Sequence, residues 1–156
     1  MQKNKNLETN SLSKNKKAFH DYEILEGFEA GIVLNGEEVK SIRAGQINLK
    51  GSFIDTLHEE AFLNGAHVSR YKFSSNKNYD PARKRKIILH KNEIAKIEKA
   101  ISQKGVTAVP LELYLKKGLI KLSIGICRGK KLYDKRESLK KHDIDLDIKR
   151  QLKNFK

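Results

Sequence analysis

Two neighbouring runs of alternating apolar and polar residues constrain the fold more than any other feature of the sequence. Leucines occupy every second position from Leu111 to Leu115, and after Lys117-Gly118 the alternation continues from Ile120 to Ile126. Because successive side chains of a strand point to opposite faces, each run predicts a half-buried strand. The short break between them predicts an antiparallel hairpin, so we expect a core built on a β-sheet.

Shorter runs of the same character add further strands, separated by turn signals such as Asn35-Gly36 and Asn64-Gly65. We expect these strands over Tyr22 to Leu34, Ser52 to His58, Ala61 to Tyr71 and Ile87 to Leu89, and helices over Glu38 to Arg43 and Asn92 to Gln103. About six short antiparallel strands with two small helices, a mainly β (α+β) fold, close most economically into a small barrel.

The 156 residues allow one compact domain with appendages. Residues 1–17 contain five lysines among Asn and Ser and few large apolar groups, which predicts a flexible basic arm or a simple solubilising terminus. Residues 18–127 are the expected folded domain. Residues 128–156 form a charged tail that we expect to be disordered until bound.

Apolar residues recur at helical spacing in this tail, at Ile144, Ile148, Leu152 and Phe155. The tail is therefore expected to form an amphipathic helix when a partner covers that stripe. A helix that packs back on its own barrel is the alternative.

A formal net charge of +14 makes a polyanion the expected partner, with nucleic acid first and an acidic membrane surface a minor alternative. The single cysteine, Cys127, cannot form an internal disulfide, and no apolar stretch is long enough to span a bilayer or to serve as a secretory signal. We therefore expect a cytoplasmic location. Nothing in the sequence indicates an obligate dimer, so a monomer is expected.

Catalytic patterns are missing from the sequence. The five histidines lack metal-ligand spacing, Cys127 has no assignable histidine partner, and adjacent acids such as Glu37 and Glu38 tend to diverge. No glycine-rich phosphate loop is present. We expect a binding protein without catalytic residues, metal or cofactor; an RNA-modifying or hydrolytic enzyme and a structural ribosomal protein are the rivals.

Several strings, in one order and at compatible spacing, carry a resemblance to a known family. They are Asn15-Lys16-Lys17-Ala18 with Asp21-Tyr22, Phe28-Glu29-Ala30-Gly31-Ile32, Glu38-Val39-Lys40-Ser41-Ile42-Arg43-Ala44-Gly45, Ala66-His67-Val68, Asp80-Pro81-Ala82-Arg83 with Arg85-Lys86, Lys91-Asn92-Glu93-Ile94, and Gly129-Lys130-Lys131 followed by Asp134-Lys135-Arg136. The sequence resembles the SsrA-binding proteins, also called small protein B, which are partners of transfer-messenger RNA.

The resemblance implies an oligonucleotide-binding (OB)-type barrel, no enzymatic activity, and rescue of stalled ribosomes by trans-translation. In the family, the barrel grips the tRNA-like domain of the RNA and the C-terminal tail enters the decoding region of the small ribosomal subunit. The family's RNA contacts correspond to Asn15, Glu29 and Ile88, the last standing where we expect leucine. The corresponding tail positions are Gly129, Lys130, Lys131, Asp134, Lys135 and Arg136.

Charge adds candidates to the residues that the resemblance implies. The residues expected to contact the RNA backbone are Lys16, Lys17, Lys40, Arg43, Arg83, Lys84, Arg85 and Lys86. Any one of them, taken alone, would be interpreted as an ordinary surface charge in contact with solvent. Glu29 would repel phosphate, so we expect it to accept hydrogen bonds from a base edge or a 2′-hydroxyl. In the tail, Tyr133 is available to stack on a base.

Overall fold

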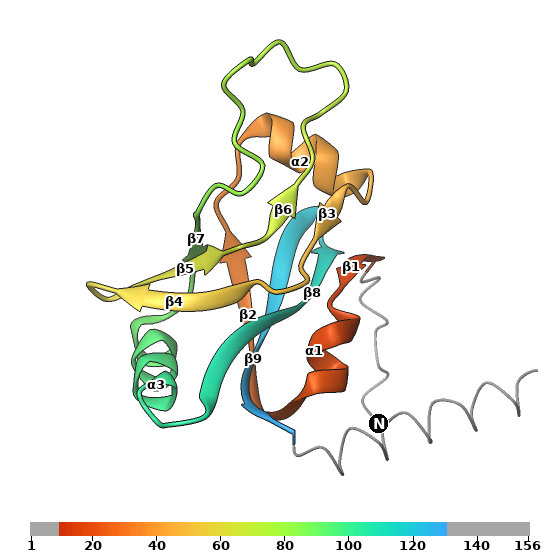
Figure 1. The fold of residues 1–156 in the computed structure, drawn as a ribbon. Helices are drawn as coiled ribbons and strands as arrows, with labels where there is room; N and C mark the ends of the chain where they lie inside the picture. The colour runs from red at the N-terminus through yellow and green to blue at the C-terminus, as the bar shows by residue number, and fades with distance from the viewer. Residues whose placement is uncertain (1–9, 131–156) are drawn as a thin grey trace, which may run out of the picture.

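The computed structural model describes residues 10–130, and residues 1–9 and 131–156 lie outside this description. The described part holds nine strands and three helices (Figure 1). In chain order they are β1 (Asn10–Lys14), α1 (Lys16–Asp21), β2 (Tyr22–Ile32), α2 (Gly36–Arg43), β3 (Ile47–Asn48), β4 (Phe53–Leu57), β5 (Glu60–Asn64), β6 (His67–Val68), β7 (Arg85–Ile88), α3 (Lys91–Ile101), β8 (Val106–Lys116) and β9 (Leu119–Gly129).

Six strands form a ring in the order β8-β4-β5-β7-β2-β9, which closes because β9 also pairs with β8. Every pairing in it is antiparallel, β1 adds to β8 from outside, and β3 and β6 form a separate small sheet. The expected mainly β fold with small helices is confirmed. Closure leaves no free edge between these six strands.

The predicted hairpin is the longest pairing of the ring. β8 and β9 each span 11 residues and are joined through Lys117 and Gly118. Both linking residues have positive φ, 50° and 76°, as a tight two-residue hairpin turn requires. Leu113 and Leu122 stand opposite each other and are fully buried, so the alternation read from the sequence does direct one face of the hairpin into the core.

Helices α2 and α3 lie at the two ends of the ring (Figure 1). Ile94 and Ile97 of α3 are buried in the core, and α3 packs on β8, β4 and β9. α2 lies at the other end, where Asn35 and Glu38 form a capping box and Ile42 is fully buried. The sequence placed both helices close to their observed ranges.

A buried ion pair joins α2 to β7. Glu38 and Arg85 are both 0 % exposed, and the Arg85 Nε donates to a Glu38 carboxylate oxygen. The other guanidinium nitrogens of Arg85 donate to the carbonyl oxygens of Ala66, Arg83 and Pro81, at 2.9–3.0 Å. Arg85 thus also holds the long segment between β6 and β7 against the ring.

Two boundaries differ from those expected. Residues 10–17, assigned to a flexible arm, form β1 and the start of α1, because β8 extends past its pairing with β4, β1 pairs with that extension, and Leu12 packs against the core. The folded domain also extends beyond residue 127, since Arg128 and Gly129 pair with Glu23 and Tyr22 of β2. The remainder of the expected arm and tail lies outside the described residues.

We expect Glu38→Ala to lower the free energy of unfolding by about 3–5 kcal/mol, because it leaves the Arg85 charge buried without its partner. Burial alone raises the pKa of Glu38, but hydrogen bonds from Arg83, the Asn35 N–H and Arg85 outweigh it and bring the pKa below 4.5. Glu38 therefore stabilises the fold above pH 4.5, and this contribution is lost as the pH falls through the lowered pKa.

Urea unfolding at several pH values measures both effects. Glu60→Ala is the matched control, since it removes the 2.9 Å Lys86–Glu60 pair, whose side chains are about half exposed, and should cost under about 1 kcal/mol. Equal losses in the two variants would contradict the role given to Glu38.

Candidate nucleic-acid interface

The basic run at β7 is split between the two faces of its strand. Arg85 and Ile87 are buried, whereas Lys84, Lys86 and Ile88 are exposed. The Lys84 Nζ lies 4.5 Å from the centre of the Phe62 ring, and the Lys86 Nζ pairs with Glu60. Strand geometry therefore leaves two lysines and one apolar side chain of this run on the outer surface.

Ile88 belongs to a row of residues that crosses four strands. It stands opposite Gly31 on β2, Gly31 opposite Lys121 on β9, and Lys121 opposite Tyr114 on β8. Paired residues point to the same side of a sheet, so all of them face outward. A Cβ on Gly31 would lie only 3.3 Å from the Ile88 Cβ, so the glycine gives the Ile88 side chain its place on this face.

Glu29 lies in the adjacent row, opposite Ser123 of β9, which in turn stands opposite Glu112 of β8. The two rows, together with Lys116 on the same side of β8, are called the Glu29 face from here on. The face is defined by Glu29, Gly31, Ile88, Glu112, Tyr114, Lys116, Lys121 and Ser123. The structure thus brings together Glu29 and Ile88, two of the three contacts that the resemblance implied.

The Glu29 carboxylate is held in a fixed position although its side chain is 42 % exposed. The Tyr114 hydroxyl donates to one of its oxygens, and the Lys116 Nζ lies 3.2 Å from both. The hydrogen bond from Tyr114 is the main cause that lowers the pKa of Glu29; partial desolvation opposes it, and Lys116 and Lys121 add to the lowering. Glu29 is therefore an ionised, oriented hydrogen-bond acceptor at neutral pH.

A groove of about 360 Å³ runs along the edge of the Glu29 face. Ile88, Gly31 and Lys121 line one part of it, and Arg43 of α2 lines another. The Arg43 Nη2 lies 3.4 Å from the Gly118 carbonyl oxygen at the β8–β9 turn. Arg43, predicted to contact the RNA backbone, thus borders the same groove as Ile88.

Asn15 is buried between α1 and the ring. Its side chain accepts from the Ala18 N–H and donates to the Pro110 carbonyl at 2.9 Å, so its polar atoms already have partners within the protein. Lys16 and Lys17, which follow it, are exposed. Asn15 therefore fixes the helix start that presents two lysines.

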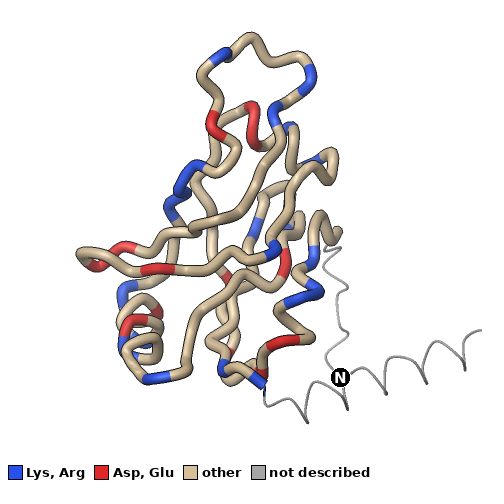
Figure 2. The backbone as a smooth tube through the Cα atoms, in the orientation of Figure 1, with Lys and Arg blue, Asp and Glu red and all other residues tan. Residues whose placement is uncertain are grey.

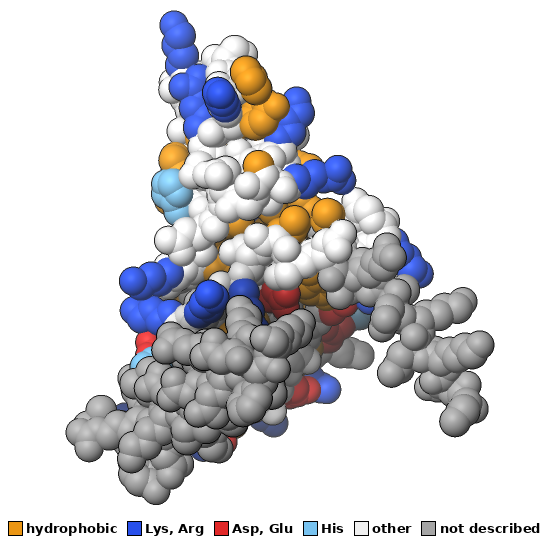
Figure 3. Space-filling view, turned by 90° about the vertical axis from the view of Figure 1, so that its right-hand side faces the viewer, with side chains coloured by type: hydrophobic (Ala, Val, Ile, Leu, Met, Phe, Trp, Pro, Cys, Tyr) orange, Lys and Arg blue, Asp and Glu red, His pale blue; other side chains and the backbone are white. Residues whose placement is uncertain are grey.

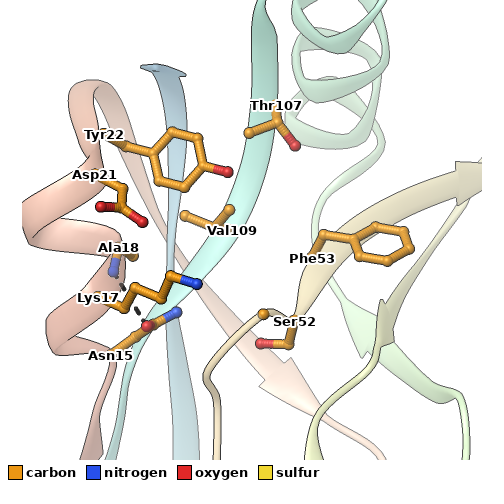
Figure 4. Close-up of a pocket in the computed structure, with 10 residues that line it drawn as sticks. Asn15, Lys17, Ala18, Asp21, Tyr22, Ser52, Phe53, Thr107 and Val109 are labelled. Carbon is orange, nitrogen blue, oxygen red and sulfur yellow. Dashed lines mark hydrogen bonds between the residues drawn. The ribbon is translucent and has the colours of Figure 1, made fainter. Parts of the chain in front are cut away.

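Beside this helix start lies a second groove of about 300 Å³ (Figure 4). Asn15, Lys17 and Tyr22 lie on one side of it, and Ser52 and Phe53 on the other. The groove lies between α1 and the chain entering β4.

β1 connects this region to the Glu29 face. Lys14 on β1 stands opposite Glu112, which stands opposite Ser123 and hence beside Glu29. Three strand spacings separate Lys14 from Glu29, about 15 Å. The two regions are neighbouring parts of one outer surface, and Figure 2 shows basic residues on α1, on β7 and in the loop before β7.

Two of the residues predicted to contact phosphates are engaged within the protein instead of projecting freely from this surface. Arg85 is in the core, in contrast to the prediction, because strand alternation directs it inward to Glu38. Arg83 is 41 % exposed but also donates to Glu38. Lys40 is exposed and lies apart from the Glu29 face, with its Nζ 5.2 Å from the centre of the Tyr71 ring.

The C-terminal candidates are described only at their start. Gly129 ends β9, and Lys130 lies against α1, its N–H donating to the Asp21 carbonyl and its Nζ to the Phe19 carbonyl. Lys131, Tyr133, Asp134, Lys135 and Arg136 lie outside the described residues.

Burial raises the pKa of the Cys127 thiol to about 11, so it stays protonated at neutral pH. Residues 10–130 contain no group of three His, Cys, Asp or Glu side chains that could hold a metal ion. Within the same range, none of the helices is both long and apolar enough to cross a membrane.

Sequence reasoning missed Tyr114, Lys116 and Lys121 as partners of Glu29. The signal was present, since the leucines of β8 point inward and their neighbours must point outward. What the sequence could not supply was the strand order, in which β9 pairs with β2 on one side and with β8 on the other.

The fold and this surface define the protein as a small antiparallel ring domain with a basic outer face, a form typical of nucleic-acid-binding domains. Residues 12–154 match the model of the family described as SmpB protein. The chain belongs to the SmpB family, which confirms the resemblance read from its motifs.

Individual relatives are similar over nearly the whole chain. The sequence is 53 % identical over 139 residues to the SsrA-binding protein of Geotalea uraniireducens, covering 89 % of this chain and 92 % of that protein. It is 51 % identical over 146 residues to the SsrA-binding protein of Streptococcus mutans, covering 94 % of each.

A solved structure is also similar. It is described as "tmRNA-SmpB: a journey to the center of the bacterial ribosome", and the matching chain gives a TM-score of 0.66 at 44 % identity. The match covers 81 % of this chain and 93 % of that one.

Proposed function

We propose that the protein binds the tRNA-like domain of transfer-messenger RNA (SsrA) and delivers this RNA to stalled ribosomes for trans-translation. Family membership supports this role, since similar chains are SsrA-binding proteins and a similar structure concerns tmRNA-SmpB on the bacterial ribosome. The role is one of binding, without a catalytic step, and it is performed in the cytoplasm, where ribosomes act.

The observation that carries the proposal is the oriented carboxylate of Glu29. An acid on a surface that must attract phosphates lowers non-specific affinity, so its place there needs a reason. Tyr114 and Lys116 keep Glu29 ionised and hold it on the outer face. In that state it accepts hydrogen bonds from base edges or 2′-hydroxyls, which only unpaired or looped nucleotides present well.

The remaining parts of the surface supply affinity and shape. Ile88, 60 % exposed, offers an apolar contact next to Glu29. Lys16, Lys17, Arg43, Lys84 and Lys86 are exposed cations available to the RNA backbone, and Lys40 and the partly exposed Arg83 add two more. In this proposal Asn15 acts through α1, by holding Lys16 and Lys17 in place.

The architecture supports the same class of ligand. We assign the ring to the oligonucleotide-binding type of barrel, in which a curved antiparallel sheet presents one outer face to nucleic acid. The ring has six strands where that type has five, and β2, which carries Glu29, lies between β7 and β9.

We expect Glu29→Ala to weaken binding to the tRNA-like domain about 10- to 100-fold. This factor corresponds to the loss of one or two hydrogen bonds to a charged group. Binding to an unrelated RNA duplex should stay the same or become slightly tighter, because a negative charge has been removed from a basic surface. Filter binding or fluorescence anisotropy at one fixed salt concentration measures both affinities.

Glu26→Ala is the matched control for this comparison. Glu26 also lies on β2, its side chain is 50 % exposed, and it faces a lysine, Lys96 of α3, at 3.9 Å. It stands outside the Glu29 face and should leave both affinities unchanged. If Glu29→Ala lowered the affinity for both RNAs equally, this would contradict the proposed role of Glu29 in specificity.

We further propose that the tail engages the ribosome. In this part of the proposal, Gly129 and Lys130 fix the start of the tail on the ring, and the residues after them enter the decoding region of the small subunit. There Lys131, Lys135 and Arg136 contact rRNA phosphates and Tyr133 stacks on a base. Asp134 belongs to the same motif. The charge density and the helical spacing of apolar residues after residue 136 support folding of the tail on binding.

A chain that ends at Lys130 should bind the tRNA-like domain as the full chain does but lose peptide tagging on stalled ribosomes. The truncation is placed there because β9 continues to Gly129 and a shorter chain would break its pairing with β2. Binding is measured by anisotropy and tagging by a reconstituted translation assay. Tagging at the level of the full chain would remove the tail from the mechanism.

A further inference from the structure

The 16-residue loop 69–84, between β6 and β7, forms a cluster of aromatic and basic side chains together with the neighbouring helix α2. The loop stands out beyond α2 at the top of Figure 1. In the view of Figure 3, apolar and basic side chains gather at this top end. The loop-tip cluster is defined as Lys40, Arg70, Tyr71, Lys72 and Phe73.

The two rings of the cluster contact each other and are each flanked by a lysine. Their centroids lie 5.6 Å apart at an interplanar angle of 68°, an edge-to-face contact. The Lys40 Nζ lies 5.2 Å from the centre of the Tyr71 ring, and the Lys72 Nζ lies 5.5 Å from that of Phe73. Cations thus lie close to aromatic faces at two places.

Hydrogen bonds fasten the loop to the body of the protein. The Ser74 hydroxyl donates to Glu37 of α2 at 2.6 Å, and the Arg70 Nη2 donates to the Ser74 carbonyl at 2.9 Å. Further along, the Tyr79 hydroxyl donates to the Val68 carbonyl at 2.7 Å. The cluster is therefore held in position relative to α2, which reduces the entropy lost when a ligand binds.

Phe73 is 76 % exposed, a large fraction for a phenylalanine in a loop that is otherwise well bonded. An isolated exposed apolar side chain is common and needs no explanation. Here the exposed ring stands among three cations and beside a second ring. A partner that fits has flat π surfaces and regularly spaced negative charges, which describes a single-stranded nucleic acid.

We propose that the loop-tip cluster binds an unpaired stretch of RNA, with a base stacked on Phe73 and flanking phosphates held by Lys40, Arg70 and Lys72. The inference takes from the proposed function only that the partner is RNA. The cluster is separate from the Glu29 face, and its ligand is a single strand rather than a folded tRNA-like domain. It is a second contact that extends the reach of the protein along its RNA.

The test uses the full chain and labelled eight-nucleotide oligoadenylate and oligouridylate, followed by fluorescence anisotropy. Phe73→Ala should weaken oligoadenylate binding about 5- to 50-fold, because it removes the stacking of one base. Phe73→Tyr should retain affinity because it keeps the ring, and Phe73→Leu should not. Oligoadenylate should bind more tightly than oligouridylate to the wild type, since adenine stacks over a larger area.

Leu57→Ala is the control, because Leu57 is also an exposed apolar residue, 53 %, at the far end of β4. Leu57→Ala should leave the affinity for both oligonucleotides unchanged. Wild-type affinity of Phe73→Ala, or full affinity of Phe73→Leu, would overturn the inference, because either result would show that no base stacks on the Phe73 ring. Affinity for the tRNA-like domain, measured on the same samples, tests the Glu29 face separately and should be unchanged by Phe73→Ala.

Discussion

The buried ion pair between Glu38 and Arg85 is the interaction on which the arrangement of this protein depends. It joins α2 to β7 across the core, and the remaining donors of Arg85 hold the segment that leads into β7. A pair of this kind is not a large source of net stability, because desolvation costs nearly as much as the charges gain. Its effect is to fix geometry: a hydrophobic contact would let α2 slide, whereas two directed hydrogen-bonding groups set its position against the sheet.

Strand alternation then distributes the charge. In β7, the same period that buries Arg85 exposes Lys84 and Lys86, so one basic run serves both the core and the surface. In β8, the leucines that fill the ring leave Tyr114 and Lys116 outside, where they hold Glu29. The core and the binding surface are thus two faces of the same strands, and a change in register in any of them would alter both.

The sequence predicted the elements that depend on local pattern. The β8–β9 hairpin, α3 and the break after β5 follow from alternation, helical spacing and turn residues. It did not predict β1, because a polar strand such as Asn10–Lys14 is stable only where a neighbour offers an edge. Nor did it separate Arg85 from the other basic residues of its run, since burial of an arginine requires an acid far away in sequence. The family resemblance named Glu29 and Ile88, but only strand order explains why they lie together.

The central claim is that the charged surface is built for one folded RNA rather than for nucleic acid in general. The most direct measurement is to purify the full chain from cells under native conditions and to sequence the RNA bound to it. The account predicts strong enrichment of a single small RNA that contains a tRNA-like fold. Recovery of bulk ribosomal RNA alone, in stoichiometric amount with ribosomes, would contradict it and would indicate a structural ribosomal protein.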